Sequence, residues 1–208
     1  MKVFISGGAK NGKSFFAQTR AKEIADAEDL PLYYLATMEP RDSEDRARIE
    51  RHRREREGWG FTTVERERNI SGLFGERPEI SPRGVFLLDS VTALLSNEMF
   101  KEEEGKWTFD LDAPERVARE LQEFSTEADH IVFVSDYIYA DASLIVAPRR
   151  SENAAAAGAP VSSATQGNSA APDYSAEYAQ GLALIDRTLA KICDEVYEAQ
   201  AGEITKWK

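Results

Sequence analysis

A glycine-rich stretch near the start of the chain has the residue types that bind phosphate. It matches the pattern G-x-x-x-x-G-K-[ST] through Gly7, Gly8, Ala9, Lys10, Asn11, Gly12, Lys13 and Ser14. In such a loop the backbone N–H groups wrap around phosphate oxygens, the lysine reaches the β- and γ-phosphates, and the serine hydroxyl binds Mg²⁺. A glycine-rich turn can match this pattern by chance. Here the motif follows a strand-like run and precedes a helix-like segment, and this context favours nucleotide binding.

A carboxylate that could hold the metal follows a second apolar run. Residues 85–88 are Val-Phe-Leu-Leu and lead directly into Asp89. This is the Walker-B arrangement, in which an aspartate at the end of a strand faces Mg²⁺ or its water shell. Asp136 follows a similar run at residues 132–135 and is a competing candidate. We predict that Ser14 and Asp89 hold Mg²⁺.

A histidine in an arginine-rich segment could act as a nucleophile. Seven arginines lie between residues 41 and 56, interleaved with acidic residues, so one interpretation is a solvated helix with ion pairs four residues apart. His52 suggests a second interpretation, because Arg48 and Arg56 lie four residues either side of it. Nearby cations favour the neutral imidazole, which could attack the α-phosphorus of a nucleotide whose phosphates the arginines bind. The other histidine, His130, precedes an apolar run and is interpreted as structural.

Strand-like and helix-like segments alternate through most of the sequence and must position these groups. We expect strands at residues 3–6, 32–37, 61–65, 85–89 and 131–135, and helices at residues 13–28, 41–57, from Asp112 onward and 174–193. This alternation predicts an α/β fold in which helices cover both faces of a mostly parallel β-sheet. Residues 196–199 and 203–207 flank Gly202 and predict a C-terminal β-hairpin.

Length and composition indicate one globular domain over residues 1–208. Hydrophobic residues make up 42% and charged residues 30%, and the formal net charge is -11. So acidic a chain lacks the basic footprint of non-specific nucleic-acid binding. No apolar run reaches the roughly 20 residues that cross a bilayer, and the first apolar stretch is too short for a secretory signal. We expect a cytoplasmic protein with no membrane span.

The cysteine content argues against disulfides, a catalytic thiol and a zinc site, and one low-complexity segment predicts a loop. Cys193 is the single cysteine, which excludes an intramolecular disulfide and fits a reducing compartment. It extends the apolar face of the helix expected at 174–193, so we interpret it as a buried small hydrophobe rather than a catalytic thiol. One cysteine and two histidines argue against a conventional zinc site. Residues 151–172 contain almost no large apolar side chain and predict a disordered surface loop.

The order and spacing of the motifs resemble those of a known family. The segments that carry the resemblance are Gly7–Ser14, Tyr34–Thr37, Arg48–His52 with Trp59, Thr63–Glu65, Leu87–Ser90 and Ser96-Asn97. Together they resemble the bifunctional adenosylcobinamide kinase/adenosylcobinamide-phosphate guanylyltransferase family of cobalamin biosynthesis. The resemblance covers residues 1–136 well and the end of the chain loosely. It implies a RecA-like P-loop NTPase fold and a homotrimer.

The resemblance also implies two reactions on a corrinoid substrate. In the first, ATP or GTP phosphorylates the hydroxyl of adenosylcobinamide, with Lys13 at the phosphates. In the second, His52 takes the place of the nucleophile that accepts GMP from GTP and passes it to adenosylcobinamide phosphate. The positions implied to contact GTP outside the phosphate loop are Leu35, Ala36, Thr37, Arg53, Arg54, Glu55, Arg56, Glu65 and Asp89.

Two other hypotheses remain open on the residues alone. One is a P-loop small-molecule kinase in which His52 is an ordinary surface residue. The other is a GTP-binding protein that has lost the corrinoid site and has no catalytic role. The joint presence of His52, Glu65 and Asp89 favours the bifunctional enzyme, whereas residues 136–188 depart from the usual motifs of the family.

Overall fold

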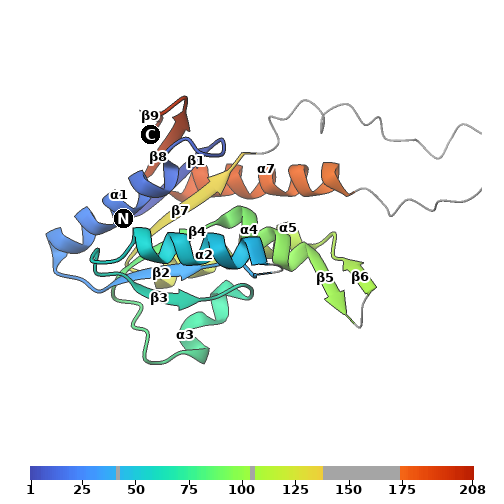
Figure 1. Cartoon of the computed structure of the whole chain (residues 1–208), viewed down its shortest axis with the longest axis horizontal. Coiled ribbons are helices and arrows are strands. Elements are labelled where there is room, and N and C mark those ends of the chain that lie inside the picture. Colours follow the sequence, from blue (N-terminus) through green and yellow to red (C-terminus); the bar gives the residue numbers. More distant parts are fainter. Residues whose placement is uncertain (41–42, 104–105, 138–173) are drawn as a thin grey trace, which may run out of the picture.

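The central element of the fold is a seven-stranded sheet (Figure 1). The computed structural model describes residues 1–40, 43–103, 106–137 and 174–208. In spatial order the strands are β3 (Thr62–Glu65), β2 (Leu32–Ala36), β4 (Val85–Asp89), β7 (His130–Asp136), β1 (Lys2–Gly7), β8 (Glu195–Gln200) and β9 (Glu203–Lys206). Every neighbouring pair is parallel except β8 with β9. The predicted α/β fold with a mostly parallel sheet is confirmed.

Helices cover both faces of this sheet. They are α1 (Lys13–Glu28), α2 (Ser43–Glu55), α3 (Leu73–Glu76), α4 (Val91–Met99), α5 (Ala113–Glu127) and α7 (Ser175–Ile192), with a 3-10 turn at Ile70–Gly72. Along β4, Val85 and Leu87 pack with α1, while Phe86 and Leu88 pack with α4, α5 and α7. A strand buried on both faces has no polar side to alternate with, which explains its continuous apolar sequence.

Several elements of the fold were not predicted from the sequence, namely the 3-10 turn, α3, α4 and the two strands that follow α4. Helix α4 begins directly after β4, where the Ser90 hydroxyl accepts a hydrogen bond from the Ala93 N–H at 3.2 Å and caps the helix. It leads into a separate antiparallel hairpin of β5 (Phe100–Glu103) and β6 (Lys106–Phe109), which projects from the end of α4 (Figure 1). The ring of Phe100 contacts both Phe109 and Tyr178 of α7.

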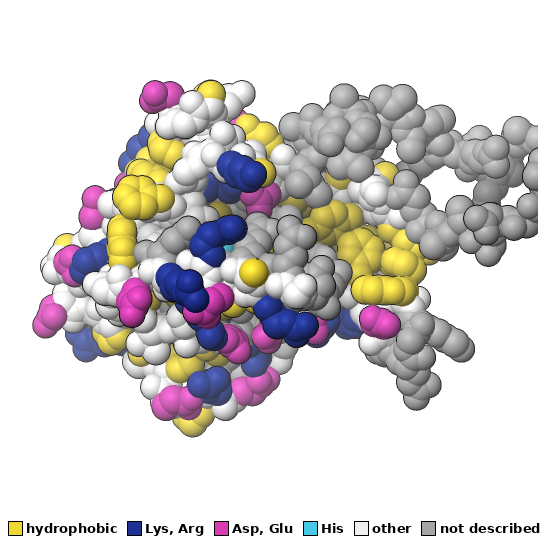
Figure 2. Space-filling model, viewed as in Figure 1, with side chains coloured by type: hydrophobic (Ala, Val, Ile, Leu, Met, Phe, Trp, Pro, Cys, Tyr) yellow, Lys and Arg dark blue, Asp and Glu magenta, His cyan; other side chains and the backbone are white. Residues whose placement is uncertain are grey.

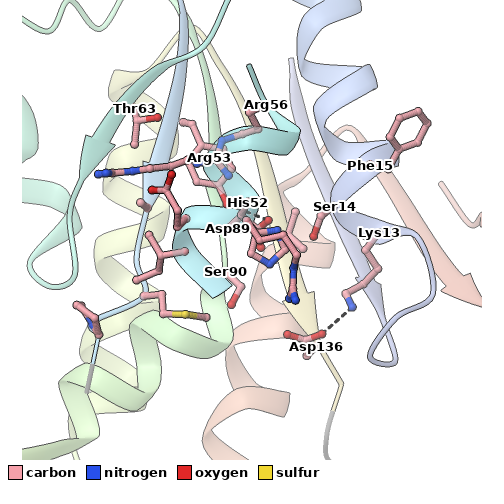
Figure 3. A pocket seen from close by; sticks show the side chains of 18 of the residues that line it. Lys13, Ser14, Phe15, His52, Arg53, Arg56, Thr63, Asp89, Ser90 and Asp136 are labelled. Carbon is pink, nitrogen blue, oxygen red and sulfur yellow. Dashed lines mark hydrogen bonds and ion pairs between the residues drawn. The ribbon is translucent and has the colours of Figure 1, made fainter. Parts of the chain in front are cut away.

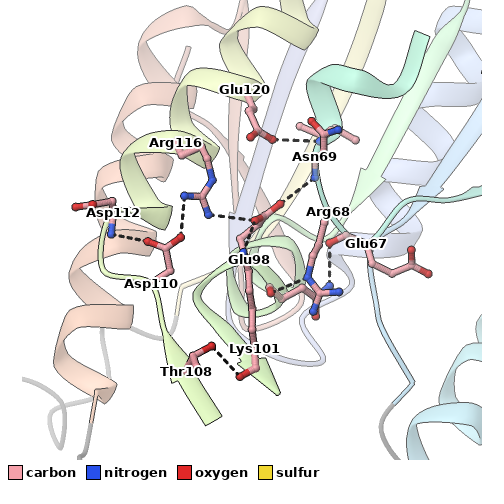
Figure 4. Close-up of polar contacts among 12 residues, drawn as sticks. Glu67, Arg68, Asn69, Glu98, Lys101, Thr108, Asp110, Asp112, Arg116 and Glu120 are labelled. Atoms are coloured by element: carbon pink, nitrogen blue, oxygen red, sulfur yellow. Dashed lines mark hydrogen bonds and ion pairs between the residues drawn. The ribbon is translucent and has the colours of Figure 1, made fainter. Parts of the chain in front are cut away.

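A buried carboxylate connects this hairpin to its neighbours (Figure 4). Glu98, near the end of α4, is 5% exposed and accepts hydrogen bonds from Arg116 of α5 at 3.1 Å and from the Asn69 backbone N–H at 2.9 Å. Lys101 of β5 lies 3.9 Å from the same carboxylate. Arg116 also donates to Asp110, which follows β6, at 2.8 Å. These contacts connect α4, α5, the hairpin and the segment after β3.

The predicted C-terminal hairpin is confirmed, and it joins the main sheet rather than standing apart. Strand β8 pairs in parallel with β1, so β1 lies between β7 and β8. A Cβ atom on Gly7 would lie 2.4 Å from the carbonyl oxygen of Ala199, so only glycine fits this close approach. The turn between β8 and β9 has positive φ at Ala201 and Gly202, as in a type I′ hairpin turn.

The structure also bears on the remaining structural predictions. Cys193 is fully buried, as expected of a small hydrophobe. His130 is buried as well, and its ring contacts Glu28 at 3.1 Å and the amino group of Met1 at 2.9 Å. In the described segments, no helix has the length and apolar character needed to cross a membrane. The loop predicted at 151–172 lies outside the described residues.

Candidate active site

A cavity of ≈ 1180 Å³ opens at the carboxyl ends of the central strands (Figure 3). The phosphate loop after β1, the ends of β2, β4 and β7, and one side of α2 all contribute to its wall. Ligand sites in parallel α/β sheets lie at this edge, because the loops that follow the strands converge there. The cavity therefore joins sequence motifs that are far apart along the chain.

The phosphate loop has the backbone geometry of an anion cradle. Gly12 has φ 82°, in the left-handed region that favours glycine, and it caps the N-terminus of α1. The first backbone bond within α1 is donated by Phe16 to Gly12 at 3.1 Å, so the N–H groups of residues 13–15 have no partner inside the helix. Lys13 is buried, and its ammonium donates to the Gly8 carbonyl at 2.8 Å and to Asp136 Oδ1 at 2.6 Å.

Both candidate carboxylates face this loop. Asp89 lies at the end of β4, where it accepts hydrogen bonds from Tyr34 at 3.1 Å and from the Ser14 hydroxyl. Burial raises the pKa of Asp89, and the nearby negative charge of Asp136 raises it further, against the lowering effect of these hydrogen bonds and of His52. Asp136 ends β7, the strand between β4 and β1. Asp89 and Asp136, the two candidate metal-binding aspartates, therefore both line the same cavity.

The histidine predicted as nucleophile lies on the opposite wall. His52 belongs to α2, lines the cavity, and is close enough to Asp89 to lower the pKa of that carboxyl (Figure 3). Arg53 pairs with Glu65 of β3, and both side chains line the cavity. On the face drawn in Figure 2, Lys and Arg side chains gather where α2 runs, among acidic residues. The side chains of Arg48 and Glu55 lie outside the described part of the structure.

Arg56 is a buried arginine that could bind an anion in the cavity. Its side chain is buried, and its guanidinium carbon lies 3.4 Å from the ring centroid of Tyr34. Within the described residues, its Nε and Nη1 atoms are buried and have no hydrogen-bond partner. A buried donor without an acceptor costs roughly 1–3 kcal/mol, and more when it is charged. An anion bound in the cavity would remove that cost.

Several residues implied to contact GTP do not line the cavity with their side chains. Leu35 is fully buried in the core, and Arg54 is exposed and pairs with Glu50 at 3.3 Å. Thr37 is buried, and its hydroxyl donates to the Ser90 carbonyl at 2.8 Å and accepts from the Ser90 N–H at 2.7 Å. A contact from residues 35–37 would come from Ala36, which does line the cavity, or from the backbone.

The structure adds residues that the sequence reasoning did not assign to the site. Tyr34 orients Asp89 and lies under Arg56. Asn97 belongs to the Ser96-Asn97 motif, and its side-chain amide donates to the carbonyls of Thr37 at 2.7 Å and Glu67 at 3.0 Å. It thereby holds the chain after β2 against the chain after β3. The strand pattern around Tyr34 indicates burial but does not indicate that Arg56, which directly follows α2, is its partner.

Residues 3–147 match the family model described as cobinamide kinase / cobinamide phosphate guanyltransferase. The chain belongs to this family. The family predicted from the motifs is therefore confirmed.

Comparison with individual proteins gives one curated relative and several distant structures. The chain is 37% identical over 101 residues to the bifunctional adenosylcobalamin biosynthesis protein CobU of Escherichia coli (strain K12). That match covers 48% of this chain and 51% of the relative, about half the length of each. Among solved structures, the flagellar accessory protein FlaH of Methanocaldococcus jannaschii has a TM-score of 0.46 at 10% identity, over 100% of this chain and 77% of that one. A KaiC-like protein of Pyrococcus horikoshii OT3 has a TM-score of 0.44 at 14% identity, over 99% and 75%.

Proposed function

We propose that this chain phosphorylates adenosylcobinamide and then transfers GMP from GTP to adenosylcobinamide phosphate through a guanylylated His52. The observation that carries the proposal is the convergence of His52, Lys13, Asp89 and Asp136 on one cavity at the carboxyl edge of the sheet. A kinase alone needs the phosphate loop and a metal carboxylate. The histidine on the facing wall adds a second chemistry, covalent transfer through nitrogen.

For guanylyl transfer, the unprotonated ring nitrogen of His52 attacks the α-phosphorus of GTP. A P–N bond forms, the bond from the α-phosphorus to the bridging oxygen breaks, and pyrophosphate leaves with the electron pair. The other ring nitrogen then releases its proton. In the second half, a phosphate oxygen of adenosylcobinamide phosphate attacks the same phosphorus, the P–N electron pair returns to the ring, and the other ring nitrogen takes up a proton, which regenerates the neutral imidazole. Lys13 and Arg56 supply positive charge where phosphate charge develops.

For phosphorylation, the substrate hydroxyl attacks the γ-phosphorus of ATP or GTP in line with the leaving diphosphate. The backbone N–H groups of the loop and Lys13 hold the phosphates, as in other P-loop enzymes. Asp136 already bonds Lys13, so it lies beside the position that the β- and γ-phosphates would take. In our proposal it receives the hydroxyl proton.

The residues present fit a magnesium ion bound together with the nucleotide. Mg²⁺ prefers oxygen ligands and is usually held by one or two carboxylates plus phosphates and water. Ser14 and Asp89 supply a hydroxyl and a carboxylate within hydrogen-bond distance of each other, and Asp136 lies nearby. We propose Ser14 and Asp89 as its protein ligands. When bound, the ion neutralises charge on the phosphates.

The deciding experiment is incubation with α-labelled GTP and Mg²⁺, followed by intact mass spectrometry. We expect a covalent GMP adduct on the wild-type chain that is labile in acid and stable in base, as a phosphoramidate is. His52→Asn should lose the adduct and the guanylyl transfer, yet retain phosphorylation of adenosylcobinamide. His130→Asn is the matched control, because that ring packs away from the cavity against Glu28.

Other outcomes would favour the other hypotheses. Phosphorylation without an adduct on the wild type would favour a P-loop small-molecule kinase. GTP binding without either reaction would favour a non-catalytic GTP-binding protein. An adduct that persists on His52→Asn would exclude this histidine as the nucleophile. From the family we also propose a cytoplasmic location and a homotrimer, and analytical ultracentrifugation of the purified chain would test the trimer.

A further inference from the structure

An aromatic pair with one exposed ring, that of Phe15, lies at the rim of the cavity. Phe15 is 67% exposed although it is a large apolar residue, and it lines the cavity. Its ring meets the ring of Trp59 edge-to-face, with centroids 5.8 Å apart and an interplanar angle of 82°. Trp59 belongs to the turn after α2, so the pair spans from α1 to that turn. The reactions proposed above make no use of either ring.

The ring of Phe15 differs from the other aromatic ring in the cavity wall. Among the described lining residues, Tyr34 is the second aromatic one. It is only 5% exposed, because Arg56 lies over its face and Phe61 packs at its edge. Of these two rings, only that of Phe15 offers an open face to a ligand.

The position of Phe15 in the phosphate loop shows which part of a nucleotide would meet it. Its N–H is one of the helix N-terminal groups without a partner inside α1, so its backbone faces the phosphates. In Figure 3 the Ser14 side chain points toward Asp89, whereas the Phe15 ring extends away from that group. The base of a nucleotide is linked to the α-phosphate through the ribose. With the phosphates at the loop, the base would therefore lie beside the Phe15 ring, away from Ser14 and Asp89.

We propose that the Phe15 ring, braced by Trp59, is the stacking platform for the purine base of the bound nucleotide. This inference rests on the proposed nucleotide-binding function and adds the base subsite to it. Because every nucleobase has a π-face, stacking supports guanine and adenine alike. The platform would thus allow one cavity to accept both ATP and GTP, and selection for guanine would come from other contacts.

The test compares GTP, ATP and inorganic tripolyphosphate, which has the phosphates but no base. Affinities are measured by calorimetry on the full chain and on Phe15→Ala. We expect Phe15→Ala to weaken GTP and ATP to similar degrees, by about tenfold, and to leave tripolyphosphate unchanged. Phe15→Tyr, which keeps an aromatic ring, should bind GTP and ATP with the affinity of the wild type. Trp207→Ala is the matched control, since Trp207 is 69% exposed and lies outside the cavity wall.

A second readout uses the fluorescence of Trp59. With Trp107 and Trp207 replaced by Phe, Trp59 is the one remaining tryptophan, and GTP should change its emission whereas tripolyphosphate should not. Unchanged GTP affinity in Phe15→Ala, or an equal loss for tripolyphosphate, would overturn the stacking platform while leaving the proposed function intact. A wild-type chain that binds neither GTP nor ATP would overturn both. Melting temperatures within a degree or two of wild type would confirm that the variants fold.

Discussion

At the scale of single residues, Lys13 is a buried cation at the centre of the site. Its buried ammonium lies 2.6 Å from Asp136 and 2.8 Å from the Gly8 carbonyl, so it is held in place at the mouth of the loop. A phosphate group has to share this cation with Asp136 or displace it. The ion pair with Asp136 therefore orients the Lys13 side chain. A bound phosphate would compete with the Asp136 carboxylate for the same ammonium group.

The first prediction follows from this position. Lys13→Ala should abolish both proposed reactions, with losses of at least roughly 100-fold in rate, because the cation stabilises charge that develops in the transition state. Steady-state assays of phosphorylation and of guanylyl transfer measure this. Lys22→Ala is the control, since Lys22 pairs with Asp26 on the exposed side of α1. Wild-type turnover by Lys13→Ala would contradict the assignment of the phosphate loop.

Asp89 gives a second prediction, in which stability and function move in opposite directions. Burial disfavours its ionised form and raises its pKa, so Asp89→Asn should stabilise the nucleotide-free protein. We expect a melting temperature higher by roughly 2–4 °C, or about 1 kcal/mol for a chain of this size. Asparagine keeps an acceptor for Tyr34. The same variant should lose the Mg²⁺ dependence of GTP binding, and a lower melting temperature would refute the argument.

At the scale of elements, the sequence predicted those whose signals are local. The strands at 3–6, 85–89 and 131–135 are apolar runs buried on both faces, and their pattern leaves little choice of structure. Helix α4 was missed although its apolar residues repeat at helical spacing. The hairpin that follows was missed for a physical reason: Phe100 packs against Tyr178, which comes from the far end of the chain.

The site divides in the same way. Residues 7–14 form a contiguous motif whose geometry is set by its own glycines, so the phosphate loop could be recognised directly. The burial of Arg56 over Tyr34 depends on how α2 and the turn that follows it pack against β2. No spacing within either element encodes that contact. The open ring of Phe15 was likewise invisible, because an apolar residue in a helix is by default expected to face the core.

The Glu98 cluster in Figure 4 yields a prediction about how the elements are held together. Glu98→Ala should lower the free energy of unfolding by about 2 kcal/mol, because Arg116 loses one of its two partners and the partly buried Asn69 N–H loses its acceptor. Glu98→Gln keeps an acceptor and should lose less. Urea denaturation measures both. Glu102→Ala, at an exposed position on β5, should change little, and equal effects at 98 and 102 would contradict the role of the cluster.

Cys193, just after α7, gives a prediction with a defined pH window. Burial raises the pKa of its thiol to about 12, above the unfolded value of about 8.5. The stabilisation from the protonated folded form is thus complete below about pH 8.5 and is lost as pH rises toward 12. Between pH 8 and 10 the wild type should lose about 2 kcal/mol more than Cys193→Ala. If the unfolding free energies of the wild type and Cys193→Ala changed equally with pH, the thiol would not be buried as described.

At the scale of the whole molecule, nucleotide binding should be visible as stability. The cavity wall draws on α1, α2 and the ends of four strands, so a ligand bound there holds the entire domain in its folded form. At 100 times its dissociation constant, GTP should add about 2.7 kcal/mol, which corresponds to roughly 5–10 °C in melting temperature. Differential scanning fluorimetry measures the shift. Lys13→Ala should show none, and a shift equal to that of wild type would place the nucleotide elsewhere.

The position of β1 has a consequence for how the protein becomes competent during synthesis. The phosphate loop is synthesised before both strands that flank β1, because β7 begins only at His130 and β8 only at Glu195. Until β8 emerges, the edge of Gly7 that will meet Ala199 stays uncovered. Contacts between such distant segments form slowly, since the intervening chain must first be closed into a loop. Until residues 195–200 have been synthesised, a nascent chain would thus carry the complete nucleotide motif on a strand that lacks one of its two neighbours.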